Sequence, residues 1–349
     1  MSRIFVHGIG AVSPAGAGVS ALRKALATGE PLPTRELARP GWEKPLVIRQ
    51  VPPFQPRPGW LGHPRLRRSS PISQFAVAAG VEALGADAEA VRSGAIRLGI
   101  ILCVMSGCVN YSRRFYDEVL KDPAVASPLL FPETVFNAPA SHLAALLGTT
   151  AINYTLVGDA GTFLQGLAVA SDWLISDQVD GCLVIAAEEI DWLTADAFRL
   201  FHKGMIMSDG AGAVYLRREN RSGWPVELAA ITSSHPFTRE QPRADAVRRM
   251  RAELPQTSSN GLLCHGAQGL PILDADEMAA WSDWTGPRRG VKSILGEGLT
   301  ATAAWQCVAG IDALQNGAHK EAIVSVVGSN QQAIGAQFVR VVQHTPISP

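Results

Sequence analysis

Short apolar runs alternate along the chain with segments in which apolar residues recur every three or four positions. The apolar runs predict strands at residues 3–7, 97–104, 152–157, 181–187, 210–216, 225–233, 322–328 and 336–342. The recurring segments predict helices at residues 19–27, 71–84, 143–147, 163–176 and 301–314. Because strands this apolar must be covered on both sides, the alternation predicts an α/β architecture with helices on both faces of a buried sheet.

The pattern also suggests two cycles of strands and helices. The run at residues 225–233 begins a second series that continues to the last predicted strand. A chain of 349 residues is long enough for two domains of about 150 residues each, or for one large domain.

Two segments of the first cycle contain residues that interrupt regular structure. Gly8-Ile-Gly10 predicts a glycine turn at the end of the first strand. A dinucleotide-binding fingerprint is the alternative, but Ser13 stands where that fingerprint needs its third glycine, so a turn is favoured over a nucleotide site. Residues 31–71 hold ten of the 23 prolines, which predicts an extended surface loop. This loop has eight basic and two acidic residues, and it is either simply solvated or a docking patch for an acidic partner.

Composition narrows the possible functions. Charged residues make up 18% of the chain against a usual figure of about 25%, which indicates that much surface is buried in a core or against a partner. Basic and acidic residues are equal at 31 each, so the chain lacks the overall positive field of a nucleic-acid-binding protein.

The cysteines and the apolar stretches predict a cytoplasmic protein. The five cysteines form an odd set without a C-x-x-C pair, which argues against both a disulfide framework and a thiolate metal site. The N-terminus lacks the zones of a signal peptide. The most apolar stretch, residues 98–109, has 12 residues against the roughly 20 that cross a bilayer, so no membrane insertion is expected.

The first candidate for chemistry is the predicted strand-to-helix corner at residues 154–163. Such a corner can hold a nucleophile, because the helix N-terminus offers N–H groups and partial positive charge to a developing anion. The corner residue is Ala160, which has no nucleophilic atom. Its neighbours Asp159 and Thr162 are interpreted as helix caps.

Two further corners carry ionisable residues. His265 follows a predicted strand and is either a general base or a hydrogen-bonded core histidine, and its neighbour Cys264 should point to the opposite face. The acidic run Asp274, Asp276 and Glu277 is interpreted as capping a following helix rather than as a metal site. Lys292 and Glu297 lie at a third, loop-to-helix corner.

In order and spacing, the three corners resemble the β-ketoacyl-acyl-carrier-protein synthases, or ketosynthases, which are condensing enzymes of the thiolase fold. Residues 6–14, 67–79, 131–142 and 208–213 resemble other signatures of that family. The resemblance implies a thiolase-like five-layer αβαβα fold built from two pseudo-repeated α/β halves. The halves would be residues 1–220, with the proline-rich excursion at 31–71, and residues 221–349.

The resemblance also implies that the catalytic site is degenerate. In the family a cysteine in a T-A-C-x-S-G turn is the nucleophile, and here Ala160 replaces it. His265 resembles the first family histidine, in H-G-T-G-T-P-L-x-D, with one extra residue before the proline. Lys292 aligns with the lysine of K-S-x-x-G-H, and Glu297 replaces the second histidine. The glycine-rich loop at residues 328–335 is altered as well.

These replacements would disable both halves of a condensation. Without a thiol no acyl thioester can form on the chain. An ionised Glu297 can accept hydrogen bonds but cannot donate them, and its charge would repel an enolate. We therefore expect no catalytic residues, no metal and no cofactor. None of the cysteines lies at a comparable corner; they are Cys103, Cys108, Cys182, Cys264 and Cys307.

The resemblance implies a chain-length-factor-like subunit in type II polyketide, aryl-polyene or fatty-acid-like biosynthesis. Such a subunit forms a heterodimer with a catalytic ketosynthase, through the strand at 152–157, and shapes its acyl tunnel. The residues expected at the tunnel or interface are Thr134, Phe136, Asn137, Tyr154, Leu156 and Phe163. Phe136 would set the chain length, or else belong to an ordinary core. Arg65, Arg67 and Arg68 would dock the acyl carrier protein.

Two alternatives remain at this point. The chain could be a repurposed enzyme that uses His265 with Glu297 or Asp159 on acyl thioesters, without a covalent intermediate. It could instead be a homodimer that only holds acyl carriers or acyl chains.

Overall fold

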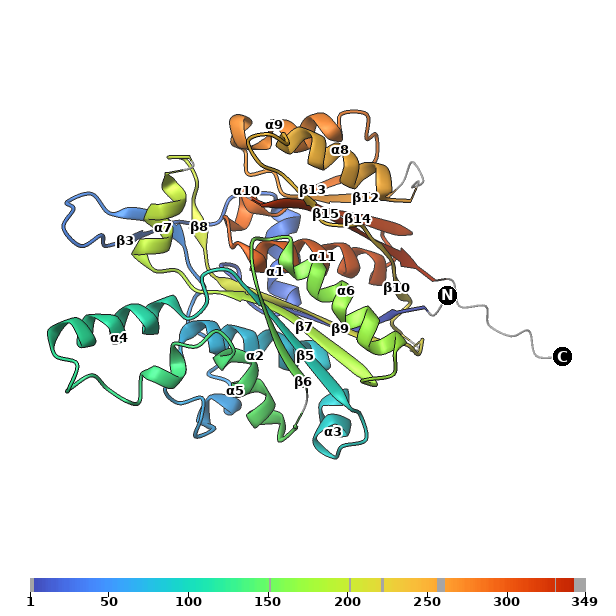
Figure 1. The fold of residues 1–349 in the computed structure, drawn as a ribbon. Helices are drawn as coiled ribbons and strands as arrows, with labels where there is room; N and C mark the ends of the chain where they lie inside the picture. Colours follow the sequence, from blue (N-terminus) through green and yellow to red (C-terminus); the bar gives the residue numbers. More distant parts are fainter. Residues whose placement is uncertain are drawn as a thin grey trace.

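The computed structural model describes residues 3–150, 152–200, 202–220, 223–255, 261–329 and 331–341. One large mixed sheet runs through the molecule in the order β13–β12–β14–β15–β10–β1–β9–β7–β5–β6 (Figure 1). Its strands are β1 (Phe5–Ser13), β5 (Leu98–Val104), β6 (Ile152–Val157), β7 (Gly181–Glu188), β9 (Gly210–Arg217), β10 (Val226–Ile231), β12 (Leu262–His265), β13 (Arg288–Gly290), β14 (Glu321–Val327) and β15 (Gln332–Arg340). Two short strands are added at its margins, β2 (Gly16–Ala17) beside β1 and β11 (His235–Pro236) beside β15.

The two halves of this sheet have the same topology. We number the five strands of each half by their order along the chain. In space they then lie in the order third, second, fourth, fifth, first, both in β6–β5–β7–β9–β1 and in β13–β12–β14–β15–β10. In each half the fifth strand is antiparallel to both neighbours, whereas the second strand is parallel to the third and fourth. The halves meet where β1 pairs with β10, at Phe5 and Glu227. The predicted boundary at residues 220 and 221 stays a prediction, because residues 221 and 222 lie outside the described ranges.

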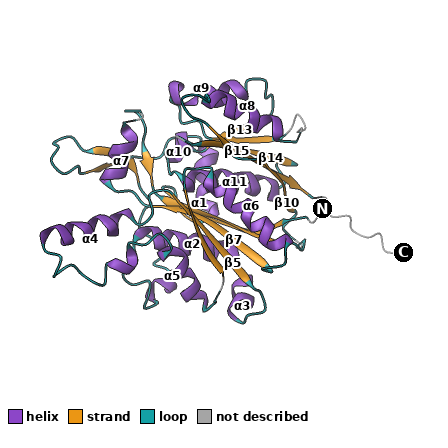
Figure 2. Ribbon diagram, in the orientation of Figure 1, coloured by secondary structure: helices purple, strands orange, loops and turns teal. Residues whose placement is uncertain are grey.

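Helices form three layers around the two half-sheets (Figure 2). The central layer holds α1 (Val19–Thr28), α6 (Thr162–Ile175) and α11 (Thr300–Gln315), and α11 contacts strands of both halves. The outer helices are α2 (Pro71–Leu84) and α5 (Ala138–Leu147) on one half, and α8 (Arg243–Glu253) and α9 (Pro271–Ala280) on the other. This arrangement is the expected five-layer αβαβα fold.

The other helices lie outside these layers. They are α3 (Asp87–Arg92), α4 (Val109–Lys121), α7 (Trp192–Arg199) and α10 (Lys292–Leu295), together with 3-10 turns at Gly59–Gly62 and Phe131–Glu133. No helix within the described ranges is long and apolar enough to cross a membrane.

The central helix α11 is buried from Thr300 to Leu314. Its small side chains let the two half-sheets approach it closely: a Cβ added at Gly212 of β9 would lie 2.6 Å from the Cβ of Ala304. Trp305 is the large exception. Its Nε1 donates to the carbonyls of Val12 (3.1 Å) and Ala211 (3.0 Å), so the buried indole leaves no unsatisfied donor.

The predicted glycine turn at Gly8 and Gly10 is wrong, because β1 continues through both residues to Ser13. Helix α2 crosses β1 at this point. A Cβ would lie 1.9 Å from the Ala83 carbonyl oxygen at Gly8, and 2.0 Å from the Ala79 carbonyl oxygen at Gly10. These glycines therefore allow the helix to pack against the strand rather than allow the chain to turn.

The proline-rich excursion is more ordered than the loop that its composition predicts. Strands β3 (Arg35–Leu37) and β4 (Leu46–Arg49) form a small sheet with β8 (Met207–Ser208). Leu46 and Ile48 of β4 are buried in a separate cluster with Phe198 and Met207. This apolar cluster stabilises the segment despite its prolines.

Three other helix predictions need correction. The helix at 143–147 begins earlier, at Ala138, with Pro139 in its first turn. Helix α4 was not predicted, since none of its residues is buried. Asp274 lies in the first turn of α9 and accepts from the N–H of its N-cap residue Leu270 (2.8 Å), as expected of a capping acid, whereas Glu277 lies further along the helix.

Candidate functional site

The strand-to-helix corner between β6 and α6 has the geometry that a nucleophile would need. The Gly158 N–H donates to the Val104 carbonyl (3.1 Å), which fixes the corner against the end of β5. Ala160 is 5% exposed and packs in the central apolar cluster. The N-cap position of α6 is Gly161, which has no side chain; of the two expected cap residues, Asp159 lies before it and accepts from its N–H (3.1 Å), and Thr162 is the first residue of the helix. The corner presents a buried methyl group at the helix start.

Asp159 connects the corner to the C-terminal half. Its buried carboxylate accepts from the N–H groups of Gly161 (3.1 Å) and Gln332 (3.3 Å) and from Nε2 of Gln332 (3.0 Å). A Cβ added at Gly328 would lie 1.7 Å from its Oδ2. Burial raises the pKa of Asp159, while these hydrogen bonds and the charge of Lys292 oppose that rise. The altered glycine-rich loop therefore packs directly on the corner.

Lys292 and Glu297 form a buried ion pair. The Lys292 Nζ lies 2.7 Å from Glu297 Oε2, and the two side chains are 5% and 1% exposed. Oε1 of Glu297 also accepts from the Leu299 N–H (2.8 Å) and from Oγ1 of Thr302 (3.3 Å). Nε2 of Gln268 approaches its other oxygen at 3.5 Å. The site thus carries a fully engaged carboxylate where the ketosynthase motif has a histidine.

His265 ends β12 and is half-buried. Its Nδ1 accepts from the Ala267 N–H (3.2 Å), and burial lowers the pKa of its imidazole, so the neutral ring is favoured. Within the described residues, no hydrogen bond joins His265 to Asp159 or Glu297. The three groups of the proposed acid–base alternative are therefore not assembled into one hydrogen-bonded unit.

The loop after His265 is held by acidic side chains. Asp274 accepts from the N–H groups of Gln268 (2.9 Å) and Leu270 (2.8 Å). Glu277 accepts from the Gly266 N–H (3.2 Å) and from Oγ of Ser325 (2.6 Å). Both carboxylates thus bind protein donors, and no group of three or more metal-ligating side chains was found among the described residues.

All five cysteines are buried, and burial raises the pKa of each thiol. The pKa values of Cys108 and Cys264 rise to about 12. Cys264 packs in the central cluster, as the strand alternation predicts. Buried thiols with raised pKa values are poor nucleophiles, because the reactive thiolate is disfavoured.

Sequence reasoning missed two carboxylates at the end of β7, although adjacent glutamates directly after an apolar strand were a visible signal. Glu188 accepts from the N–H groups of Met105 (2.6 Å) and Ser106 (3.0 Å) and from Oγ1 of Thr300 (2.6 Å). Glu189 accepts from the N–H of Asn110 (2.8 Å). Burial raises the pKa of both carboxyls to about 7. They fix the loop after β5 and the start of α11 beside the corner.

The expected tunnel residues before α5 lie at the surface. The Phe136 ring packs against Gly107, where an added Cβ would lie 2.3 Å from its Cδ1, and the side chain is still 40% exposed. It is therefore not an ordinary core residue of this chain. Oγ1 of Thr134 donates to the Phe131 carbonyl (2.8 Å), and Asn137 is an exposed N-cap without a side-chain bond.

The other expected interface residues fall into two environments. β6 is an edge strand, and Tyr154 is 53% exposed with its ring 4.9 Å from that of Trp173, in an edge-on contact. Val157 on the same strand is 57% exposed. Leu156 is partly buried against the central cluster, and Phe163 is wholly buried in it. Phe163 thus belongs to the core of this chain, whereas β6 leaves apolar side chains uncovered.

The three arginines expected to dock a carrier lie together on an exposed turn before α2. Leu66 is fully buried and anchors this turn, and the Arg68 carbonyl accepts from the Tyr111 hydroxyl (2.8 Å). Within the described part of the chain, no ion pair involves Arg65, Arg67 or Arg68. Their charges are therefore available to an acidic partner.

Comparisons with known proteins agree on the fold. No known family profile matches the sequence, and no curated protein matches it. The solved ishigamide ketosynthase/chain length factor is similar over 97% of this chain and 100% of its own, with a TM-score of 0.77 and 17% identity. A β-ketoacyl synthase from Burkholderia phymatum STM815 gives a TM-score of 0.80 at 17% identity over 98% and 100% of the two chains. A chain of the type II polyketide complex AntDE:AntF gives a TM-score of 0.77 at 16% identity, over 97% of this chain and 99% of its own.

At this level of identity the likeness establishes the fold. The chain has the thiolase-like fold of ketosynthases and chain length factors, as its motifs predict. What the chain does depends on its own residues.

Removing one partner of the Lys292–Glu297 pair should destabilise the protein strongly. Lys292→Met leaves Glu297 as an unpaired buried charge, which costs about 3–5 kcal/mol in the free energy of unfolding. The double variant Lys292→Met/Glu297→Gln leaves no such charge and should cost clearly less than the sum of the single changes. Chemical denaturation of the four proteins measures this coupling. Additive effects would show that the pair makes no net contribution.

Proposed function

We propose that this chain is a non-catalytic subunit of chain-length-factor type, which pairs with an active β-ketoacyl-acyl-carrier-protein synthase in cytoplasmic biosynthesis of a type II polyketide, an aryl polyene or a fatty-acid-like product. The observation that carries the proposal is Ala160 at the corner where a condensing enzyme of this fold needs a thiolate. The engaged Glu297 supports it, because this carboxylate cannot donate a hydrogen bond to an enolate.

The distribution of apolar side chains supports the pairing. Sixteen large apolar side chains are exposed among the described residues, and ten of them lie between positions 116 and 157. This range includes the edge strand β6 and the loop that holds Phe136. An apolar edge strand exposes unpaired backbone groups and favours association with another strand. We therefore assign β6 as the contact with the catalytic homologue.

The remaining assignments follow from this contact. Phe136 lies on a loop against Gly107 and is the residue that we assign to limiting the length of the acyl chain in the shared tunnel. Arg65, Arg67 and Arg68 are assigned to the acyl carrier protein, because their exposed charges complement an acidic surface.

The isolated chain should not capture an acyl group. When it is incubated with a radiolabelled acyl-carrier thioester and then denatured, no label should remain, because Ala160 offers no atom for a covalent bond. A homologous ketosynthase with its cysteine intact is the positive control. Label that survives denaturation, or turnover of the thioester by the isolated chain, would contradict the proposal and favour an enzyme that uses His265.

A charge on β6 should break the pair. Val157→Asp places a carboxylate in an apolar contact and should weaken association at least about tenfold, since burying an unpaired charge is costly. Ile272→Asp on α9, which is 79% exposed, is the matched control. Light scattering of the chain co-expressed with a catalytic homologue measures the assembly. Unchanged association of the Val157→Asp variant would remove β6 from the interface, and a homodimer that persists beside the homologue would support the holding-protein alternative.

Shortening Phe136 should lengthen the product. Phe136→Ala in the reconstituted pair removes a ring from the position assigned to the tunnel end, so mass spectrometry should detect chains with at least one additional extender unit. Ile272→Ala, far from this loop on α9, should leave the product unchanged. Products of unaltered length from Phe136→Ala would refute the assignment.

A further inference from the structure

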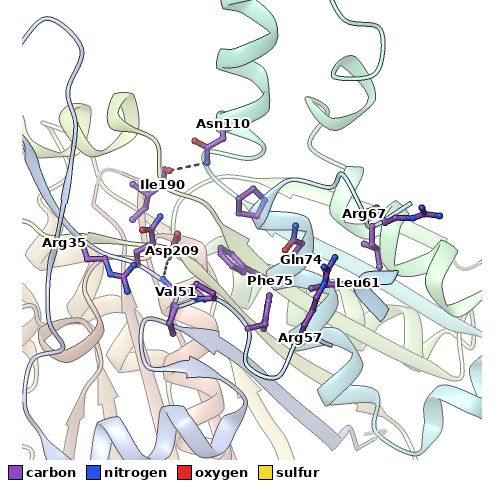
Figure 3. Close-up of a pocket in the computed structure, with 16 residues that line it drawn as sticks. Arg35, Val51, Arg57, Leu61, Arg67, Gln74, Phe75, Asn110, Ile190 and Asp209 are labelled. Carbon is purple, nitrogen blue, oxygen red and sulfur yellow. Dashed lines mark hydrogen bonds between the residues drawn. The ribbon is translucent and has the colours of Figure 1, made fainter. Parts of the chain in front are cut away.

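A cavity of about 500 Å³ lies outside the corner and outside β6, between the proline-rich excursion and the start of α2 (Figure 3). This volume is within the range of small-molecule sites, which is about 300–1,000 Å³. Phe54 and Phe75 form part of its apolar wall, with their ring centres 6.5 Å apart. Trp60 packs edge-on against Phe54 from behind (5.8 Å), so this wall is held in place.

The two ends of the cavity carry different charges. Asp209 and Arg35 lie toward one end, and Arg57 and Arg67 toward the other, with Phe75 between them (Figure 3). Asp209 is 3% exposed and accepts from the Val51 N–H (2.7 Å); burial raises the pKa of its carboxyl to about 7, and the Val51 hydrogen bond and the charge of Arg35 oppose that rise. One end therefore offers a carboxylate that is fixed by the backbone and partly balanced by a cation.

At the other end of the cavity, no carboxylate forms an ion pair with the arginines within the described ranges. Arg57 and Arg67 are both exposed, and neither forms an ion pair within the described ranges. The Arg57 guanidinium at the end of an apolar cavity is a favourable environment for an anion, because guanidinium binds carboxylate and phosphate through paired N–H donors, and the nearby positive charge of Arg67, whose side chain points outward in Figure 3, adds to the attraction. Asp209 would repel an anion at the opposite end but accept a hydrogen bond from a hydroxyl or amide.

We propose that this cavity binds an elongated organic anion, with its anionic group at Arg57 and Arg67, an apolar middle against Phe54 and Phe75, and a hydrogen-bond donor directed at Asp209. The ligand class is thus an amphipathic acid with a polar far end, such as a hydroxy fatty acid. This site is independent of the proposed subunit role, and Arg67 is the one residue that it shares with the carrier-docking turn.

The test uses the full chain and four probes: 8-hydroxyoctanoate, octanoate, 1-octanol and acetate. Calorimetry or saturation-transfer NMR should detect 8-hydroxyoctanoate binding most tightly and octanoate more weakly. Octanol and acetate should bind at least about tenfold more weakly than 8-hydroxyoctanoate, since each lacks an end or the apolar middle that the cavity recognises. Equal binding of acetate would reduce the cavity to a bare anion site, and no binding of any probe would overturn the proposal.

Variants locate the binding in the cavity. Arg57→Ala should weaken 8-hydroxyoctanoate at least about tenfold, because a charge-assisted hydrogen bond is lost. Arg249→Ala removes an equally exposed charge from α8 and should have no effect. Arg57 lies outside the carrier-docking set, so failure here and failure of carrier binding are distinguishable. Unchanged affinity of the Arg57→Ala variant would overturn the assignment.

Discussion

The buried ion pair between Lys292 and Glu297 constrains the loop-to-helix corner at which the central helix α11 begins. Moving two charges out of water costs several kcal/mol per ion, and only close geometry with further hydrogen bonds offsets this cost. Glu297 meets that requirement with donors from Leu299 and Thr302 in addition to Lys292. Each donor comes from α10 or from the start of α11, so the pair fixes the entrance of the central helix.

The same contacts engage the carboxylate of Glu297, which stands where the ketosynthase motif has a histidine. A condensing site needs a thiolate and free hydrogen-bond donors, whereas this corner has the methyl group of Ala160 and carboxylates that already accept bonds. Asp159 joins the two halves through Gln332 instead of facing a substrate. Asp159 therefore contributes to the packing of the two halves against each other.

Elements with a continuous run of buried apolar residues could be predicted from the sequence. Features that depend on contacts between distant segments could not. The strand at 181–187 was predicted to within one residue of its observed end at Glu188, because a continuous buried apolar run has few alternatives. Gly8 and Gly10 were misread as a turn, since the requirement comes from α2, 70 residues later in the chain. The degenerate corner was predicted from motif spacing. The engagement of Glu297 by Thr302 and Gln268 was not, because it depends on how loops from two regions meet.

The low charged fraction of 18% has a structural counterpart in two places. One is the buried helix α11, which carries a single charged residue, Asp312, paired with Arg23 at 2.6 Å. The other is the edge strand β6, where Ile152, Tyr154 and Val157 are between 41% and 57% exposed in the single chain. A free apolar edge would promote uncontrolled strand pairing, and natural proteins suppress it with charges, bulges or a cover. β6 is six residues long and carries no charged residue, and its exposed apolar side chains are the feature on which the proposed pairing rests.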